Sequence, residues 1–251
     1  MKIMFSKMFS LQTKFAFVLG LALLVIGTSC KKNDDNEPEN KISNDELEAI
    51  VEGSLVANYQ GIAKEAFDAA VITEASVEKT TTTLECGETR DTSVTWSFGS
   101  GNVSAGYNGL WTWTLNCTPQ SLPTSLVYTR NTNGQYESAR LKAMETATGQ
   151  WVVSNLTTGL FYVLNGSYSR QGSQMFKIGN QNTFSSTTQF TVTDLKVNKI
   201  TKLIDSGLAT LVISGEGTTG YSFNHTGSVE FLGDGSAIVT VNGHTWTVDL
   251  Y

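Results

Sequence analysis

The first pattern in the chain that predicts folded structure is helical, because apolar residues recur at steps of three and four positions and form one stripe. The stripe consists of Leu47, Ile50, Val51, Leu55, Tyr59, Ile62, Ala66, Phe67 and Ala70. Ser43 and Glu46 have the spacing of a capping box, in which each side chain bonds the backbone amide of the other. Gly53 and Gly61 weaken the pattern, so we expect the helical segment, residues 43–75, to bend or split.

From about residue 80 the apolar period changes to two, which predicts half-buried antiparallel strands. Val94, Trp96 and Phe98, for example, alternate with hydroxyl residues. Similar runs cover residues 111–117, 159–171, 184–197, 207–214, 227–232, 236–241 and 244–250. Because no helical pattern separates them, we expect a mainly β fold: an antiparallel meander over residues 80–251, either a sandwich or a partly open barrel.

Asn-Gly and Asp-Gly dipeptides recur along the predicted β region. Both dipeptides tolerate the positive φ angles of type I′ hairpin turns. They stand at Asn108-Gly109, Asn133-Gly134, Asn165-Gly166, Asp234-Gly235 and Asn242-Gly243. We therefore expect a tight turn at each of these five places.

The aromatic residues fall into two groups: rings that we expect in the core, and rings that we expect to be exposed and able to bind a ligand. Four indoles share a face with Val, Leu and Phe and should point inward: Trp96, Trp111, Trp113 and Trp246. Trp151 and Tyr107 stand beside Gly and Asn, at places that we interpret as strand ends, and we expect them to be exposed. Exposed rings stack on sugar C–H faces, so these two residues are the candidate ligand-binding residues.

The N-terminal pattern indicates export. Residues 15–27 form an apolar run behind three lysines, too short for a helix that spans a hydrocarbon core of about 30 Å. Small residues and then Cys30 follow, so we expect residues 1–29 to be a cleaved signal peptide. This resembles a bacterial lipoprotein signal, although Gly27 stands where such signals usually have an aliphatic residue. The resemblance implies a triacylated Cys30 at the mature N-terminus.

The segment after Cys30 is polar and acidic, and residues 30–42 are expected to be a lipidated cysteine followed by a disordered tether. The stretch Cys30-Lys31-Lys32-Asn33-Asp34-Asp35 resembles lipoproteins of Bacteroidota, in which such acidic residues accompany export to the cell surface. The resemblance implies an outer-membrane anchor that faces outward, with the periplasmic face as the alternative.

The second half of the chain adds to this resemblance. The patterns YVLNGSYSRQG and TGSVEFLGDGSAIVTVNGHTWTVDL are similar to those of β-rich Bacteroidota lipoproteins, over residues 90–251. The resemblance implies a location and an architecture, and it transfers no functional residue to this chain.

Cys86 and Cys117 are the two thiols that remain after Cys30. In an exported domain such a pair most simply forms a disulfide, and two buried free thiols are the alternative. The spacing does not suggest a metal site, and His225 and His244 are the only histidines. We expect no metal and no cofactor.

Charge excludes one class of partner. The chain has 17 basic and 23 acidic residues, and loss of the signal peptide leaves 14 basic ones, a net charge of −9. A chain without a basic stripe gains nothing from counterion release, so we expect no nucleic-acid partner.

Catalysis is not expected either, because no nucleophile, zinc or phosphate-binding motif is present. A glycoside hydrolase that uses two carboxylates stays open as an alternative, with Glu85, Glu88, Asp91, Glu137, Glu216 and Glu230 as candidates. A lipocalin-like carrier of a small apolar ligand is a second alternative. The preferred hypothesis is a non-catalytic binding or structural lipoprotein, with a glycan as first ligand and another surface protein as a further partner.

Overall fold

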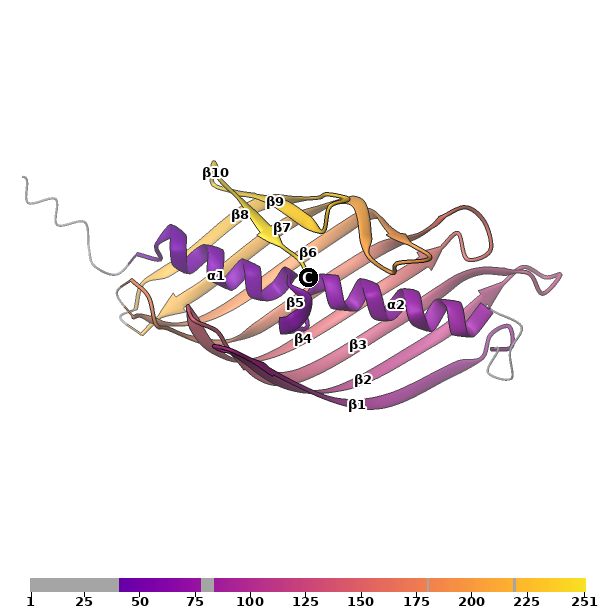
Figure 1. Ribbon diagram of the computed structural model, residues 1–251, viewed down its shortest axis with the longest axis horizontal. Coiled ribbons are helices and arrows are strands. Elements are labelled where there is room, and N and C mark those ends of the chain that lie inside the picture. The colour runs from indigo at the N-terminus through magenta and orange to yellow at the C-terminus, as the bar shows by residue number, and fades with distance from the viewer. Residues whose placement is uncertain (1–40, 78–83, 180, 219) are drawn as a thin grey trace, which may run out of the picture. The chain divides into compact units, whose positions relative to one another are not determined.

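Ten antiparallel strands form one open sheet in the computed structural model, which describes residues 41–77, 84–179, 181–218 and 220–251. Each strand pairs with the next one along the chain (Figure 1). The strands are β1 (Thr89–Ser100), β2 (Val103–Cys117), β3 (Pro123–Glu137), β4 (Leu141–Ser154), β5 (Phe161–Phe176), β6 (Thr183–Asn198), β7 (Ile204–Gly217), β8 (Ser222–Phe231), β9 (Ser236–Val241) and β10 (His244–Asp249). The predicted antiparallel meander is confirmed, and its second layer is helical instead of a second sheet.

The predicted signal peptide, Cys30 and the tether as far as residue 40 lie outside the described residues.

The helical segment precedes the sheet and is split, as predicted, into α1 (Asn44–Leu55), a short 3-10 helix η1 (Ala57–Tyr59) and α2 (Ile62–Val77). The capping box forms: the Glu46 amide donates to Ser43 Oγ over 3.3 Å, and the Ser43 amide donates to Glu46 Oε2 over 2.9 Å. The chain reverses tightly before α2. A Cβ at Gly61 would lie 2.6 Å from the Ser54 carbonyl oxygen, so this turn requires glycine.

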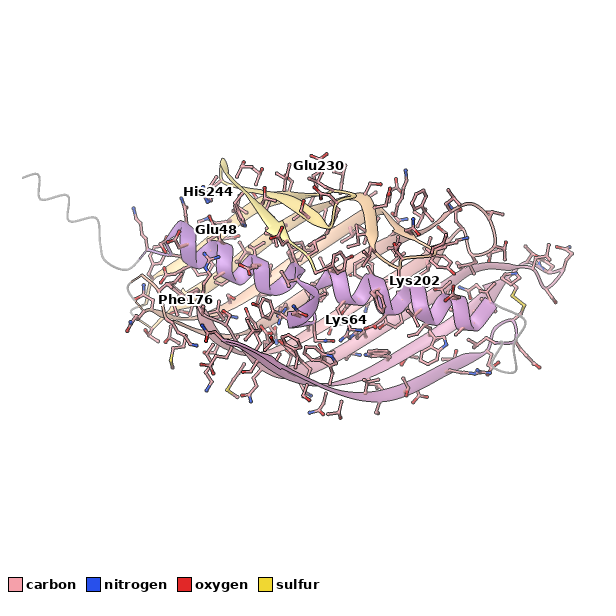
Figure 2. All side chains as sticks on the ribbon, in the orientation of Figure 1. Glu48, Lys64, Phe176, Lys202, Glu230 and His244 are labelled. Atoms are coloured by element: carbon pink, nitrogen blue, oxygen red, sulfur yellow. A yellow bond between two sulfur atoms is a disulfide. The ribbon has the colours of Figure 1, made fainter. Side chains whose placement is uncertain are left out.

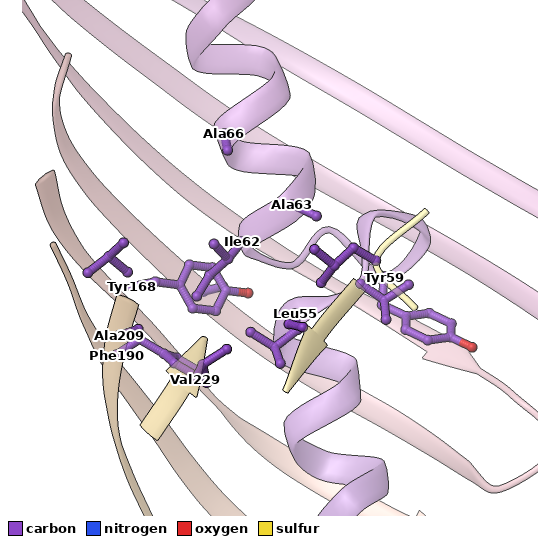
Figure 3. Packing of buried hydrophobic residues seen from close by; sticks show 14 of the residues in the cluster. Leu55, Tyr59, Ile62, Ala63, Ala66, Tyr168, Phe190, Ala209 and Val229 are labelled. Carbon is purple, nitrogen blue, oxygen red and sulfur yellow. The ribbon is translucent and has the colours of Figure 1, made fainter. Parts of the chain in front are cut away.

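Both helices pack on one face of the sheet, which we call the inner face; the opposite side is the outer face. α1 contacts β5, β6 and β10, while α2 contacts β3 to β7 (Figure 1). The predicted apolar stripe is buried, except that Phe67 is partly exposed. Figure 3 shows residues of this cluster where the helix breaks, among them Leu55 and Ile62, with Tyr168 and Phe190 of the sheet. Burying each such side chain stabilises the fold by about 1.5–3 kcal/mol.

The C-terminal hairpin completes the packing around α1. The Ala57 amide donates to the Leu250 carbonyl over 2.9 Å, directly after β10. At the other end of β10, His244 Nε2 lies 2.8 Å from Glu48 Oε1, and the two side chains are neighbours in Figure 2. The last strand is therefore held to α1 at its start, and the residue that follows it is held to η1.

Two of the five predicted turns are confirmed, and three are wrong. Asp234-Gly235 and Asn242-Gly243 connect β8 to β9 and β9 to β10, with positive φ at Gly235, Asn242 and Gly243. The dipeptides within strands are Asn108-Gly109 in β2, Asn133-Gly134 in β3 and Asn165-Gly166 at the bulge of β5. The physical reason is packing: a Cβ at Gly134 would lie 2.4 Å from the Tyr107 ring, so this glycine makes room for an aromatic neighbour.

The strands β3 and β4 were not predicted as runs of their own. On the inner face of β3, Arg130 and Thr132 follow Leu126 and Tyr128, so polar residues interrupt the apolar alternation that sequence patterns detect. Both polar residues are nevertheless buried.

Cys86 and Cys117 form the predicted disulfide, which joins the segment before β1 to the end of β2. It closes a loop with a sequence separation of 31 residues. The alternative of two free thiols is therefore wrong.

Candidate functional site

The outer face carries rows of uncharged polar side chains, because register partners on neighbouring strands point to the same side of a sheet. One of these rows, the amide row, crosses the sheet from β1 to β8. It consists of Thr95, Asn108, Asn133, Thr146, Gln171, Thr187, Ser214 and Asn224. Every member is a hydroxyl or an amide, so each can both donate and accept a hydrogen bond.

The rows on either side of the amide row are mostly polar, but they also contain the exposed apolar side chains of Leu110, Met144 and Val212. One contains Ser93, Leu110, Asn131, Thr148, Ser169, Gln189, Val212 and Thr226; the other contains Ser97, Gly106, Gln135, Met144, Ser173, Ser185, Glu216 and Ser222. Glu216 is the one charged residue in these three rows. Neighbouring members bond one another, as in Thr95 to Asn108 and Thr148 to Asn131, each over 3.0 Å.

A groove of about 1170 Å³ runs along the amide row, and we call it the outer groove. Six members of the amide row line it, Asn108 to Ser214, together with residues of the neighbouring row that contains Glu216. Gly134, Gly172 and Gly215 also contribute. These glycines are register positions of the inner face, where neighbouring side chains occupy the space that a Cβ would need: the Tyr107 ring at Gly134 and the Phe223 ring at Gly215.

The chemistry available in the outer groove is hydrogen bonding. Besides glycines, Met144 and Phe223, its lining among the described residues contains amides, hydroxyls and two carboxylates, and no histidine, cysteine, lysine or arginine. One carboxylate, Glu145, is buried and bound by Arg170 and the Tyr107 hydroxyl, the latter over 2.5 Å. The other, Glu216, is exposed. The groove therefore offers many neutral donors and acceptors and a single free carboxylate.

The inner face holds a different kind of polar cluster, buried between the sheet and the helices. Arg170 is at its centre and binds the Glu145 carboxylate, the Gly53 carbonyl, the Tyr59 carbonyl over 2.8 Å and the Tyr107 hydroxyl over 2.7 Å. The guanidinium thus ties the end of α1 and η1 to β2, β4 and β5. Its other neighbour is the Tyr136 ring, whose centroid lies 5.2 Å away.

A second buried cluster lies beside α2. Arg130 Nη1 donates to Asp68 Oδ2 over 3.2 Å, and Arg130 Nη2 donates to the Gln60 side-chain oxygen. Lys64 binds the other oxygen of Asp68. Charged side chains buried in this way are tolerated because each has an opposite charge or a hydrogen-bond partner.

Burial sets the protonation of these groups. It raises the pKa of Glu65 to about 7, while the nearby Arg130 and the hydrogen bond from Trp151 oppose the rise. Burial also raises the pKa of Asp68 against the opposing charges of Lys64 and Arg130. The pKa of Tyr107 is raised by burial as well, although Arg170 lowers it. The clusters connect helices to strands, which is a structural role.

The expected exposure of Trp151 and Tyr107 is wrong. Trp151 is 1% exposed and Tyr107 is 4% exposed, and both side chains point to the inner face under the helices. Neither lies at a strand end: Trp151 is within β4 and Tyr107 within β2, where their polar atoms bind Glu65 and Glu145. They cannot stack on a sugar from solvent, and their role is in the core.

The other four indoles face inward as predicted, and each is partly buried against the core: Trp96, Trp111, Trp113 and Trp246.

Of the six candidate carboxylates, Glu216 alone lines the outer groove. Glu88 and Glu137 are partly exposed and pair with Arg90 and Lys177, each over 2.7 Å. These hydrogen bonds lower the pKa of both carboxyls, the opposite of what a general acid needs. Among the described residues, no group of three His, Cys, Asp or Glu side chains could hold a metal ion.

Sequence reasoning missed the buried polar residues Glu65, Arg130, Glu145 and Arg170. A signal was available for the two arginines, because Arg130 follows Leu126 and Tyr128 at steps of two. Similarly, Arg170 follows Tyr168 on the same face of β5. Period-two patterning places both on the buried face, and a buried arginine requires partners.

Comparisons with protein families, with curated proteins and with solved structures find no match for this chain. Within the described residues, no helix has the length and apolarity needed to span a membrane.

Proposed function

We propose that this protein is a lipid-anchored protein of the cell envelope that binds a neutral glycan through the outer groove and carries out no catalysis. The observation that supports this most is the amide row, which presents uncharged donors and acceptors across eight strands beside a groove of about 1170 Å³. Sugar hydroxyls need partners of this kind, because each hydroxyl both donates and accepts.

The absence of charge along the amide row distinguishes it from an ordinary solvated surface. Soluble surfaces are typically about a quarter to a third charged. Stripping water from a charged side chain without a counter-charge is far more unfavourable than stripping it from an amide that regains its hydrogen bonds. A face of amides and hydroxyls is therefore suited to a neutral hydrogen-bonding ligand, and an extended one can contact several strands at once.

The anchor is the second part of the proposal. We propose triacylation at Cys30 after cleavage of residues 1–29, with attachment to the outer membrane and exposure on the outside of the cell. Two or three acyl chains anchor a protein stably, whereas one chain does so only marginally. Residues 31–40 can separate the anchor from the described domain by at most about 35 Å, the reach of ten extended residues. The domain would thus stay close to the membrane surface.

The alternatives have less support. A carrier needs an interior cavity of several hundred cubic ångströms, whereas α1 and α2 pack their apolar side chains onto the face that would hold such a ligand. A hydrolase needs two carboxylates at a set separation, and in the groove the Glu145 carboxylate is engaged by Arg170. A protein partner on the outer face is consistent with the same row of amides and would appear as a negative result with glycans.

The groove is tested with two isosteric substitutions on neighbouring strands. Gln171 lines the groove, and Gln189 lies on the outer face outside the groove lining. We expect Gln171→Glu to weaken binding of neutral polysaccharides about tenfold, equivalent to about 1.4 kcal/mol, and Gln189→Glu to leave it unchanged. Titration calorimetry on neutral and acidic polysaccharides provides the measurement. Equal effects of the two substitutions, or no binding by the native domain, would contradict the glycan proposal.

The anchor is tested separately by expressing the full chain and its Cys30→Ser variant in a Gram-negative host that processes lipoproteins. We expect the native chain to stay with the membrane fraction after a high-pH wash and the variant to be released. Degradation by protease added to whole cells would indicate the outward orientation, and protection would favour the periplasmic face.

A further inference from the structure

A small crevice lies on the inner face between the start of α2 and the first three strands. Its volume is about 60 Å³, room for a few atoms. Gln60 and Lys64 line it from the helical side, and Trp96, Tyr107 and Trp111 form aromatic walls on the sheet. Lys64 is labelled in Figure 2.

Polar atoms without a partner gather at this crevice. Gln60 Nε2, Trp111 Nε1, Arg130 Nε and Thr132 Oγ1 are all buried and make no hydrogen bond within the described residues. All four residues line the crevice. Gln60 and Arg130 are each 2% exposed and Thr132 is 6% exposed, so open solvent does not satisfy them. Buried polar groups are rarely left unpaired, and four at one hollow indicate that something with acceptor atoms occupies it.

The residues that carry these atoms lie together. Gly109 lies beside it: a Cβ there would lie 3.0 Å from Thr132 Cγ2 and 3.2 Å from Trp111 Nε1. The Arg130 guanidinium carbon lies 5.0 Å from the centroid of the Trp111 ring. Glycine at position 109 therefore avoids crowding the threonine methyl group and the indole N–H beside the crevice.

The charge around the crevice favours an anion. Lys64 and Arg130 are cationic, and both bind the single carboxylate of Asp68. The adjacent Glu65 faces Trp151 and Arg130, and because burial raises its pKa to about 7 it is substantially protonated at neutral pH. Three of the four unpaired atoms are N–H donors, which call for acceptor oxygens.

We propose that this crevice binds the carboxylate group of a small organic acid. Its two oxygens accept hydrogen bonds from the unpaired donors of Gln60, Trp111 and Arg130, and Thr132 contributes its hydroxyl. The body of the acid lies against Trp96, which is partly buried and stacks on Phe98 with ring centroids 6.0 Å apart. This site is on the opposite face from the outer groove and does not depend on it.

Benzoate, which joins a carboxylate to a flat apolar ring, is a suitable probe, and benzamide is its neutral control. We expect benzoate to bind the native domain and to shift the Trp111 indole N–H resonance in NMR spectra. Benzamide should bind at least about tenfold more weakly. Equal binding of the two compounds, or no binding of benzoate, would overturn the proposal and leave water as the occupant.

Two variants locate the site. Gly109→Ala fills the space beside Trp111, and Thr132→Val removes the hydroxyl at nearly constant volume; each should weaken benzoate binding about tenfold. Gly99→Ala on β1 is the control, because its Cβ would meet no atom within 4 Å, and it should bind as the native domain does. If Gly109→Ala fails to fold, Thr132→Val decides the matter. Unchanged affinity in Thr132→Val would contradict the proposal, whereas Gln171→Glu should bind benzoate normally whatever its effect on glycans.

Discussion

The indole Nε1 of Trp151 donates to Glu65 Oε2 over 2.7 Å and joins β4 to α2 across 86 positions of the sequence. Both side chains are buried: Trp151 is 1% exposed and Glu65 is 0% exposed. A hydrogen bond that favours the carboxylate is thus set against burial that disfavours it, and burial is the larger of the two influences on its pKa.

This relationship predicts a pH dependence of stability. The pKa of Glu65 rises from 4.5 to about 7 on folding, so between these values the folded protein holds a proton that the unfolded chain has released. Stability should therefore fall as the pH rises from about 4.5 to about 7, by about 3 kcal/mol, and be level above that.

The measurement is urea unfolding between pH 4 and pH 9 for the native protein and Glu65→Gln, which cannot titrate. Between about pH 4.5 and about pH 7, the unfolding free energy of the native protein should fall relative to that of Glu65→Gln. Parallel curves would show that Glu65 titrates normally.

The buried pair of Arg170 and Glu145 predicts strong coupling. Arg170→Leu leaves the Glu145 carboxylate buried without its counter-charge and frees the carbonyls of Gly53 and Tyr59. We expect a loss of about 3–5 kcal/mol.

The double variant Arg170→Leu with Glu145→Leu should lose less than the sum of the two single variants, because no unpaired charge remains. A double-mutant cycle by chemical denaturation measures this coupling. Additive losses would mean that the two side chains do not interact.

The disulfide between Cys86 and Cys117 predicts a redox-dependent stability. Opening a loop of 31 residues should lower the free energy of unfolding by about 3.5 kcal/mol, because the unfolded chain gains freedom. Denaturation with and without reductant provides the measurement, and the double Cys→Ser variant should match the reduced protein and no longer respond to reductant. A response to reductant that persists in this variant would rule out this disulfide as its source.

The close packing around Gly134 of β3 predicts that a larger residue is not tolerated there. Its missing Cβ would lie 2.2 Å from the Gly106 carbonyl oxygen and 2.4 Å from the Tyr107 ring, so Gly134→Ala should be destabilising by about 1–3 kcal/mol. Gly106→Ala on the neighbouring strand is the matched control, because its Cβ would meet nothing within 4 Å. Thermal unfolding of the two variants tests this, and similar melting temperatures would show that the ring moves aside freely.

Much of the local structure follows from the chain alone. The capping box of Ser43 and Glu46 and the two periodicities predict the helices and the meander, because both depend on neighbours a few residues apart. The pairing of Cys86 with Cys117 also follows, since no other pairing is available in the expected mature domain. The inward direction of Trp96 and Trp246 comes from the same alternation with apolar residues.

The tertiary structure alone decided what covers each face and where a strand continues. An Asn-Gly pair forms a turn at Asn242 and continues a strand at Asn133, because in the second case the Tyr107 ring takes the place of a Cβ at Gly134. Trp151 is buried because α2 places Glu65 over it, a contact that joins positions 86 residues apart. The amide row, likewise, exists only through the register of eight strands. The period of two along a strand indicates which residues share a face of the sheet. Long-range packing of the helices determines which face is covered and which face stays accessible to a ligand.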